Sequence, residues 1–297
     1  MEYGCLPPKI FLSMKKGMVT FKDAFLEKYP DRGAVLRYYE QATNRKPTWN
    51  DFSAYSLNKF RKYMLEESGL CQKSVRRYLT WFSIVMAMFE EEVSLPKNWR
   101  KYLHVADDIS QNAFLTEGEL AKIMAYKPQT ENEKYIKNSF LLGALTGARH
   151  SDYMNFTERN IKDGWLNYVS QKTKKEASVP ANAYILKLIR EKSRLSVELS
   201  DKAINEIIRR ICAKSGIDEE IQLYQKGKYH VKPKYEFLAS HSARRSFATN
   251  LYLRGADIYQ IMKLMGHSNT QVTEGYICCG LRTLSPEVMG FFDSFNR

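Results

Sequence analysis

Long apolar runs are scarce in this sequence, and none reaches the length of a membrane-spanning helix. The longest, WFSIVMAMF at residues 81–89, is far shorter than the roughly 20 apolar residues that cross a bilayer, and three glutamates follow it. The N-terminal stretch MEYGCLPPKIFLSMKKG is interrupted by Pro7 and Pro8 and lacks the apolar core of a signal peptide. We therefore expect no membrane partner and a cytoplasmic location.

Metal-binding and nucleotide-binding patterns are also missing. The five cysteines are odd in number and form no CxxC pair, which argues against a disulfide framework or a zinc site and favours reduced thiols. The sequence has no acidic cluster for magnesium and no glycine-rich phosphate-binding loop. We therefore expect neither a metal ion nor another cofactor.

Positive charge, by contrast, is abundant. The 297 residues include 46 lysines and arginines against 33 acidic residues, which gives a net charge of +13. An excess of this size indicates a polyanionic partner, with nucleic acid as the leading candidate. A surface charged only for solubility is the alternative. The apolar fraction of 44% is enough for a real core, and the length favours two domains.

Helical periodicity dominates the first part of the chain, residues 19–103. Leu57, Phe60 and Met64 share one helical face, and a second helix begins near residue 72. Residues 95–113 show no clear periodicity, and Thr116 then opens a new helix with a capping box. We expect a helical domain over residues 1–105, a linker over 106–115 and a second domain over 116–297.

The second domain is predicted to contain both helices and strands. NSFLLGALTG predicts a buried helix that breaks at Thr146 and Gly147, and GWLNYVSQKTKKEASVPA predicts a β-hairpin with a basic turn. An amphipathic helix capped by Ser200 follows. The expected fold class is mainly α, with a small antiparallel β-sheet in the C-terminal domain.

The segment HSARRSFATN, residues 241–250, concentrates positive charge at the start of a helix. Ser240 is the expected N-cap, and Gly255 ends the helix. His241 and Arg244 share a face, so an imidazole and a guanidinium project together from a helix N-terminus. Such a site suits a phosphate, which a guanidinium binds through two parallel hydrogen bonds.

Four further residues carry a weaker signal when each is taken alone. His267 directly follows Gly266 at a helix end, where a histidine often only caps carbonyls, and Tyr276 stands nine residues later. Arg149 follows the Thr146-Gly147 break, and Lys172 lies in the basic hairpin turn. Taken singly, Arg149 is better explained as a surface arginine and Lys172 as part of a solvated basic turn.

Another basic group opens the predicted helix near residue 72. Lys73, Arg76 and Arg77 lie in its first turns, where positive charge opposes the helix dipole. They indicate either an external anion or a solvated basic turn, and the sequence leaves both open.

Together, these residues resemble the active site of the tyrosine recombinases, the phage-integrase and Xer-type class of site-specific DNA recombinases. The resemblance covers residues 116–285, and residues 15–105 resemble the helical, SAM-like core-binding domain of that family. It implies a two-domain, C-shaped DNA clamp whose second domain breaks and rejoins DNA. The form HSARRSFATN is most similar to integrases of bacterial mobile elements. The expected catalytic set is Arg149, Lys172, His241, Arg244, His267 and Tyr276.

The resemblance also implies the mechanism. Tyr276 attacks a DNA phosphodiester and forms a 3′-phosphotyrosine, the two arginines hold the phosphate, and His267 donates to a phosphate oxygen. Lys172 is the expected general acid, although Lys174 and Lys175 lie in the same turn. Asp152 is expected to support the site through the catalytic arginine or its neighbours. The expected DNA-binding residues are Lys73, Arg76, Arg77, Lys174, Lys175 and Arg245, the last standing where many relatives have histidine.

The expected partners follow from the same resemblance. They are a double-stranded recombination site, further copies of the chain (a dimer on each site and a tetramer on two duplexes), and accessory DNA-bending proteins. We expect the protein itself to be associated with the nucleoid. The apolar residues of the tail, Met289, Phe291, Phe292 and Phe295, suit docking on a neighbouring copy, with packing on the same domain as the alternative. The chain begins too near the helical block for an additional N-terminal DNA-binding domain, which favours a Xer-like layout.

Two other functions remain open on the sequence alone. One is DNA relaxation of the type IB topoisomerase kind, which uses the same chemistry without strand exchange. The other is a catalytically silent regulator that uses its basic residues only to hold DNA.

Overall fold

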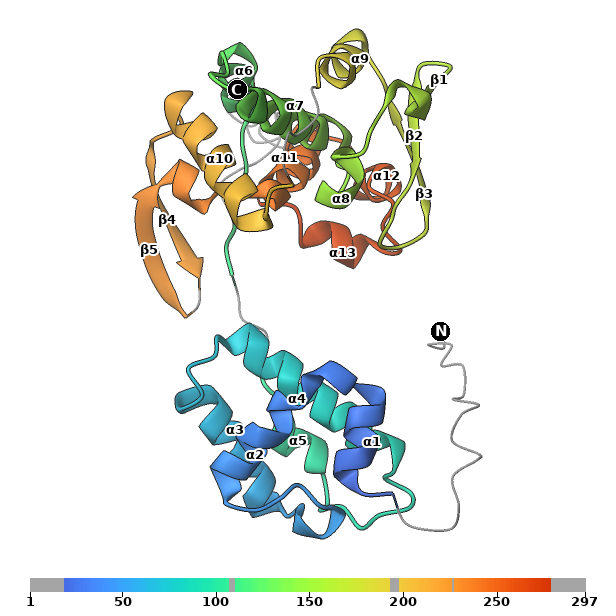
Figure 1. The fold of residues 1–297 in the computed structure, drawn as a ribbon, viewed down its shortest axis with the longest axis vertical. Coiled ribbons are helices and arrows are strands. Elements are labelled where there is room, and N and C mark those ends of the chain that lie inside the picture. The colour runs from blue at the N-terminus through green and yellow to red at the C-terminus, as the bar shows by residue number, and fades with distance from the viewer. Residues whose placement is uncertain (1–18, 107–109, 193–197, 226, 279–297) are drawn as a thin grey trace, which may run out of the picture. The chain divides into compact units, whose positions relative to one another are not determined.

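The computed structural model describes residues 19–106, 110–192, 198–225 and 227–278, and the chain divides into two compact units, residues 1–109 and 110–297 (Figure 1). Helices predominate, and two small antiparallel sheets lie in the second unit. The expected fold class is therefore confirmed. Within the described ranges, no helix combines the length and the apolarity needed to cross a membrane. The apolar tail and Cys5 and Cys279 lie outside the described residues.

The first unit is a bundle of short helices around an aromatic core. Its helices are α1 (Phe21–Lys28), α2 (Ala34–Thr43), α3 (Ala54–Glu66), α4 (Gln72–Met88) and α5 (Trp99–Leu103), with 3-10 turns at Pro30–Arg32 and Trp49–Asp51. Phe82 of α4 lies at the centre, where its ring is 4.5 Å from that of Phe21 and 5.1 Å from that of Phe60. Burial of these rings stabilises the unit because each removes a large apolar area from water.

Helix α5 was not expected, because residues 95–113 show no amphipathic period. Its five residues are too few to display one, yet Trp99 and Leu103 at its two ends are both buried in the core of the first unit. By contrast, Leu57, Phe60 and Met64 of α3 are fully buried, as their spacing predicts.

The second unit is built around one long buried helix, α7 (Figure 1). Helices α9, α10 and α11 pack against α7, and Thr130 caps its start. The elements of this unit are α6 (Glu117–Ala125), α7 (Glu131–Thr146), α8 (His150–Tyr153), a 3-10 turn (Glu158–Asn160), β1 (Ile161–Lys162), β2 (Trp165–Val169), β3 (Glu176–Pro180), α9 (Ala183–Arg190), α10 (Asp201–Lys214), β4 (Glu220–Gln225), β5 (Lys228–Pro233), a 3-10 turn (Lys234–Phe237), α11 (Ser240–Leu253), α12 (Ile258–Leu264) and α13 (Thr270–Glu274).

Gly147 ends α7 at the expected break, and its backbone requires glycine. Its φ is +66°, in the left-handed region, and a Cβ atom there would run into the ring of Phe247 on α11. The close approach lets the carbonyl of Gly147 face the side chains of α11. The chain then turns directly into α8, with Arg149 as its N-cap.

Strands β1, β2 and β3 form the expected small antiparallel sheet, with Lys172 in the turn between β2 and β3. Leu166 and Tyr168 face the core, whereas Trp165 and Val169 are exposed. A second hairpin, β4–β5, was not expected. It is tied to the residues that enter the second unit, because the amide of Gln111 donates to the carbonyl of Tyr224 at 2.8 Å.

Helix α11 runs as the sequence predicts, except at its first residue. Ala239 occupies the N-cap position, so the expectation that Ser240 caps the helix is wrong. One tertiary and one local contact supply the capping: the amide of Ser240 donates to Oδ1 of Asn205 at 2.8 Å, and the amide of Ala239 donates to Oγ of Ser242, three residues on, at 3.1 Å. Gly255 follows the helix with a φ of +82°.

Candidate active site

Arg244 lies at the centre of the site and is almost completely buried, with 1% of its surface exposed. Its Nη1 donates to the carbonyl of Gly147, and its Nη2 donates to the carbonyl of Met265 at 2.8 Å and to Nε2 of His267. Its Nε is buried and has no partner among the described residues. A buried donor without an acceptor is costly, so this atom is suited to an external acceptor.

Arg149 and Asp152 connect helix α8 to the hairpin that carries Lys172. Nη1 of Arg149 donates to Oγ of Ser170 at 3.0 Å, and the amide of Gln171 donates to Oδ1 of Asp152 at 2.9 Å. Ser170 and Asp152 are both buried. These two contacts fix the base of the turn directly before Lys172, whose own side chain is exposed.

His267 is neutral in this arrangement. Burial, together with the positive charges of Arg244 and Arg149, lowers the pKa of His267 to about 3. A guanidinium can only donate, so Nε2 of His267 accepts from Arg244, and Nδ1 carries the proton that it donates to Oγ1 of Thr273 at 2.9 Å. In this tautomer Nε2 has no proton to give to a phosphate, which differs from the role expected for His267.

Tyr276 packs its ring against the two central residues. The Cζ atom of Arg244 lies 5.2 Å from the ring centre, a cation–π contact, and the ring of His267 stacks on it at 5.2 Å and 29°. Burial and the charge of Arg149 lower the pKa of Arg244, and the interaction with Tyr276 opposes them by favouring the charged guanidinium. The hydroxyl-bearing ring is thus held beside the guanidinium.

His241 and Lys172 lie at the open side of the site. Desolvation lowers the pKa of His241, and the positive charges of Arg245, His150, Arg244 and Lys172 lower it further. The structure therefore places Lys172 and Arg244 within electrostatic range of His241. All six residues of the expected catalytic set are brought to one place from five segments of the second unit.

The two arginines of this cluster lack acidic partners in the part of the chain that the structure describes. Among the residues that the structure describes, no carboxylate forms an ion pair with Arg149 or Arg244. Mutual repulsion of the two guanidinium groups is unfavourable, and an anion between them would relieve it. The arrangement is therefore suited to hold a phosphate and to stabilise charge that builds on it.

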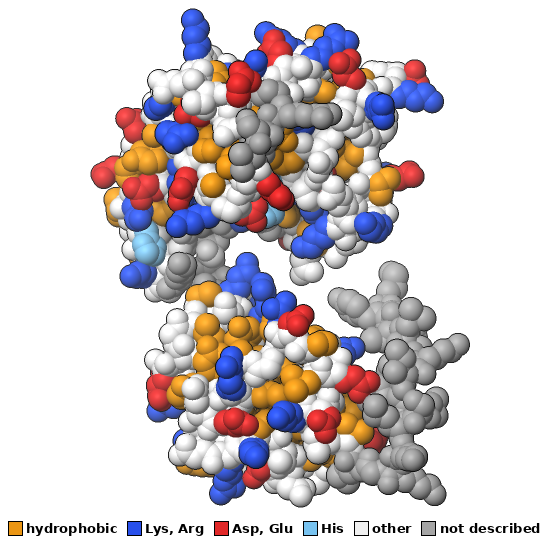
Figure 2. All heavy atoms as spheres, in the orientation of Figure 1, with side chains coloured by type: hydrophobic (Ala, Val, Ile, Leu, Met, Phe, Trp, Pro, Cys, Tyr) orange, Lys and Arg blue, Asp and Glu red, His pale blue; other side chains and the backbone are white. Residues whose placement is uncertain are grey.

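The expected DNA-binding residues fall into two groups. Lys73, Arg76 and Arg77 are exposed on α4 in the first unit. Lys174, Lys175 and Arg245 lie in the second unit, where Arg245 is half-buried. On the face drawn in Figure 2, lysine and arginine side chains lie among acidic ones on both units.

Four uncharged residues around the cluster were missed by the sequence reading: Tyr168, Ser170, Thr249 and Thr273. Burial raises the pKa of Tyr168, and the nearby positive charges of Arg244 and Arg149 oppose this effect. The alternation along β2 places Tyr168 and Ser170 on the same face as Leu166, so the strand pattern could have found these two. Nothing in the sequence pattern distinguishes the two threonines.

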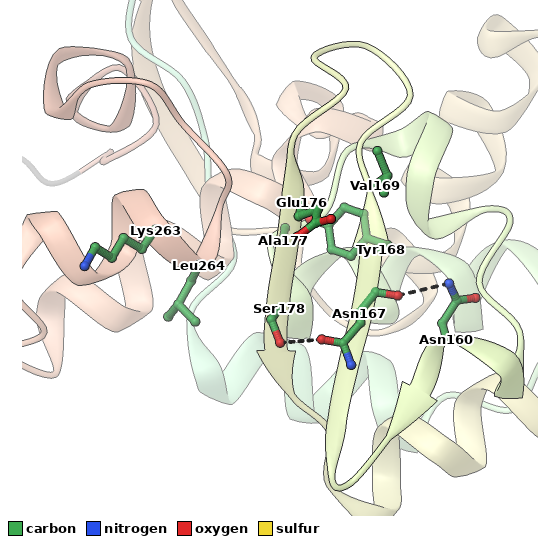
Figure 3. A pocket seen from close by; sticks show the side chains of 9 residues that line it. All are labelled: Asn160, Asn167, Tyr168, Val169, Glu176, Ala177, Ser178, Lys263 and Leu264. Carbon is green, nitrogen blue, oxygen red and sulfur yellow. Dashed lines mark hydrogen bonds between the residues drawn. The ribbon is translucent and has the colours of Figure 1, made fainter.

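A separate hollow lies between the outer face of the hairpin and α12 (Figure 3). Lys263 and Leu264 project from α12 on one side, and Asn167 and Ser178 line the other, joined by a hydrogen bond of 2.7 Å. None of the six clustered residues lines it. The hollow therefore contains none of the catalytic set, although Tyr168, which lies near both arginines, is part of its lining.

Comparison with known proteins gives consistent matches. The sequence profile of the phage integrase family matches residues 113–278. Tyrosine recombinase XerC of Rickettsia bellii is 30% identical over 155 residues, which are 50% of this chain and 49% of that protein. The integrase of Escherichia phage P2 is 23% identical over 211 residues, or 70% of this chain and 56% of that protein. The chain thus spans about half the length of these curated relatives.

The fold is also similar to that of solved structures. One of them is the Tn1549 transposon integrase in complex with transposon right end DNA, with a TM-score of 0.63 and 12% identity. The match covers 94% of this chain and 100% of that one. At this low identity the likeness shows a shared fold.

Proposed function

Because the chain belongs to the phage integrase family, we propose that it is a site-specific DNA recombinase, an integrase that cuts and rejoins DNA through a phosphotyrosine on Tyr276. The observation that carries this proposal is the state of Arg244. Its guanidinium is buried near Arg149 with no carboxylate partner among the described residues, the N–H of its Nε is unused, and the ring of Tyr276 packs against it. A scissile phosphate would satisfy the donor and meet the nucleophile.

In the proposed reaction the hydroxyl oxygen of Tyr276 bonds to phosphorus while the bond from phosphorus to the 5′ oxygen breaks. Arg149 and Arg244 hold the non-bridging oxygens and stabilise the charge of the transition state. The tyrosine proton passes to His241, and Lys172 gives a proton to the leaving 5′ oxygen. The energy of the broken bond is kept in the phosphotyrosine, so rejoining needs no nucleotide.

His267 and Asp152 take supporting roles in this proposal. Neutral His267 accepts from Nη2 of Arg244, which fixes the orientation of the guanidinium. Asp152 holds the amide of Gln171 and so keeps the turn with Lys172 over the site. His267 can donate to a phosphate oxygen only after its Nε2 gains a proton or its tautomer changes.

The first unit completes the proposal as a core-binding domain. Its exposed residues Lys73, Arg76 and Arg77 would contact DNA phosphates, and the two units would hold the duplex as a clamp. Strand exchange joins a 5′ hydroxyl of one duplex to the phosphotyrosine of another, so several copies must act together, as a tetramer on two duplexes. The matches to a phage and a transposon integrase support an origin in a mobile element. Action on chromosomal DNA would place the protein at the nucleoid.

The test is a covalent trapping experiment. The DNA that flanks the gene supplies candidate sites, and a nicked duplex of the bound site is incubated with the protein and run on a denaturing gel. We expect an adduct that survives detergent with the natural protein and with Tyr259→Phe, an exposed tyrosine of α12, but not with Tyr276→Phe.

The other two functions predict different results. A protein that binds its site tightly but never forms an adduct would be a DNA-binding regulator. Relaxation of a supercoiled plasmid that lacks any bound site would indicate topoisomerase activity instead. Either result would overturn the proposed recombinase.

A further inference from the structure

The backbone around Tyr276 is tied to helix α11 by one buried hydroxyl, that of Thr249. Thr249 is fully buried, and its Oγ1 accepts from the amide of Cys278 at 3.0 Å. The same hydroxyl donates to the carbonyl of Tyr276 at 3.4 Å. The two contacts therefore fall on the residue that carries the nucleophile and on the second residue after it.

The other hydrogen bonds of this segment join residues that are close in sequence: the amide of Ile277 donates to the carbonyl of Glu274 at 3.1 Å, and Sγ of Cys278 donates to the carbonyl of Tyr276 at 3.5 Å. The amide of Tyr276 donates to the carbonyl of Thr273 at 2.9 Å, which only continues the short helix α13. Tyr276 and Ile277 also pack partly buried against an apolar cluster that includes Phe247 and Met265. Apolar burial holds the segment near the site but sets no fixed direction, whereas hydrogen bonds do.

We propose that Thr249 is a positioning residue for the nucleophile: its hydroxyl fixes the backbone of residues 276–278 so that the phenol of Tyr276 meets a phosphate held by Arg244. Thr249 and Arg244 lie five residues apart on α11, so one helix places both the nucleophile and the phosphate clamp. The inference rests on the proposed function of Tyr276. Its physical basis is that a small displacement of a reacting atom costs a large factor in rate.

The test compares two substitutions that differ in the hydroxyl. Thr249→Val keeps the size of the side chain and removes both contacts, and Thr249→Ser keeps the hydroxyl. We expect Thr249→Val to cleave a nicked duplex at least about 10-fold more slowly in a single turnover, with DNA affinity unchanged. We expect Thr249→Ser to cleave at close to the natural rate.

A second measurement reads the contact itself. Hydrogen exchange at the amide of Cys278 should become faster in Thr249→Val and stay slow in Thr249→Ser, because the valine offers no acceptor. This measurement needs no DNA and no activity. If the natural protein formed no adduct, the proposed function would fail, and an unchanged exchange rate at Cys278 would separately overturn the role of Thr249.

Ser246 provides a matched control on the same helix. Its hydroxyl is also fully buried, donates to the carbonyl of Ser242 at 2.7 Å and accepts from the amide of Leu115 at 2.8 Å, so it ties a different segment to α11. Ser246→Ala should lower thermal stability and change the cleavage rate less than about two-fold. The inference is wrong if Thr249→Val cleaves at the natural rate, if Thr249→Ser is equally slow, or if Ser246→Ala slows cleavage as much.

Discussion

Replacing Arg244 with lysine should abolish most cleavage while leaving DNA binding intact. The substitution keeps a positive charge on α11 but removes the planar guanidinium. In the natural protein Nη1 and Nη2 bind Gly147, Met265 and His267, and Nε remains for a phosphate oxygen. A lysine ammonium has one nitrogen in place of three, so it cannot keep these contacts and bind a phosphate in the same geometry.

The size of the effect follows from the donors that are lost. Loss of one preorganised donor to a developing oxyanion costs about 10²–10³ in rate, or roughly 3–4 kcal/mol. Affinity for the whole site is spread over many phosphate contacts, and the charge is retained, so we expect the dissociation constant to change less than about three-fold.

The assay separates these two quantities. Single-turnover cleavage of the nicked duplex gives the rate, and a gel-shift titration at fixed salt gives the affinity. Arg254→Lys is the control, because Arg254 follows the same helix but is exposed and paired with Glu117. The phosphate-clamp argument is refuted if Arg244→Lys cleaves as fast as Arg254→Lys, or if binding and cleavage fall together.

Two further predictions concern single groups of the site. Lys172→Ala should cleave roughly 10²–10⁴-fold more slowly than the natural protein. A DNA whose bridging 5′ oxygen is replaced by sulfur should restore the cleavage rate of this variant, because a thiolate leaves without a proton. Lys174→Ala is the control, and if the sulfur-containing DNA rescued only Lys174→Ala, the general acid would be Lys174. The lowered pKa of His267, about 3 against an ordinary value near 6.5, means that the unfolded chain binds a proton that the folded chain does not. Stability should therefore fall as the pH drops below about 6.5, and His267→Gln should reduce that slope by about 1.4 kcal/mol per pH unit in thermal or urea unfolding. His230→Gln is the control. If the pH dependence of stability in His267→Gln were as steep as in His230→Gln, the neutral state of His267 would be contradicted.

The sequence predicted those parts of the fold that local chemistry determines. The capping box of Thr116 and Glu119 starts α6, and Gly147 ends α7, because each involves only neighbouring residues. Helix α5 and the start of α11 escaped prediction because tertiary contacts decide them: two buried ends in the first case and Asn205 in the second.

The candidate site shows the same division. The resemblance to the tyrosine recombinases identifies the six charged or nucleophilic residues, because their types and order along the chain match that family's pattern. Their state is a property of the packed core: neither the burial of Arg244 nor the tautomer of His267 can be derived from spacing. The hydroxyl of Thr249 is invisible for the same reason, since its partner lies 29 residues away.

The choice of neutral partners for Arg244 explains how a buried cation can serve a phosphate. Carbonyl groups and a neutral imidazole orient the guanidinium without cancelling its charge. A carboxylate in their place would form an ion pair that an incoming phosphate would have to break. The buried carboxylate of Asp152, which lies within electrostatic range of Tyr168, instead accepts a hydrogen bond from the amide of Gln171 and holds the hairpin. Asp152 thus serves to position the hairpin, and the positive charge of the cluster stays available to the phosphate that we propose it binds.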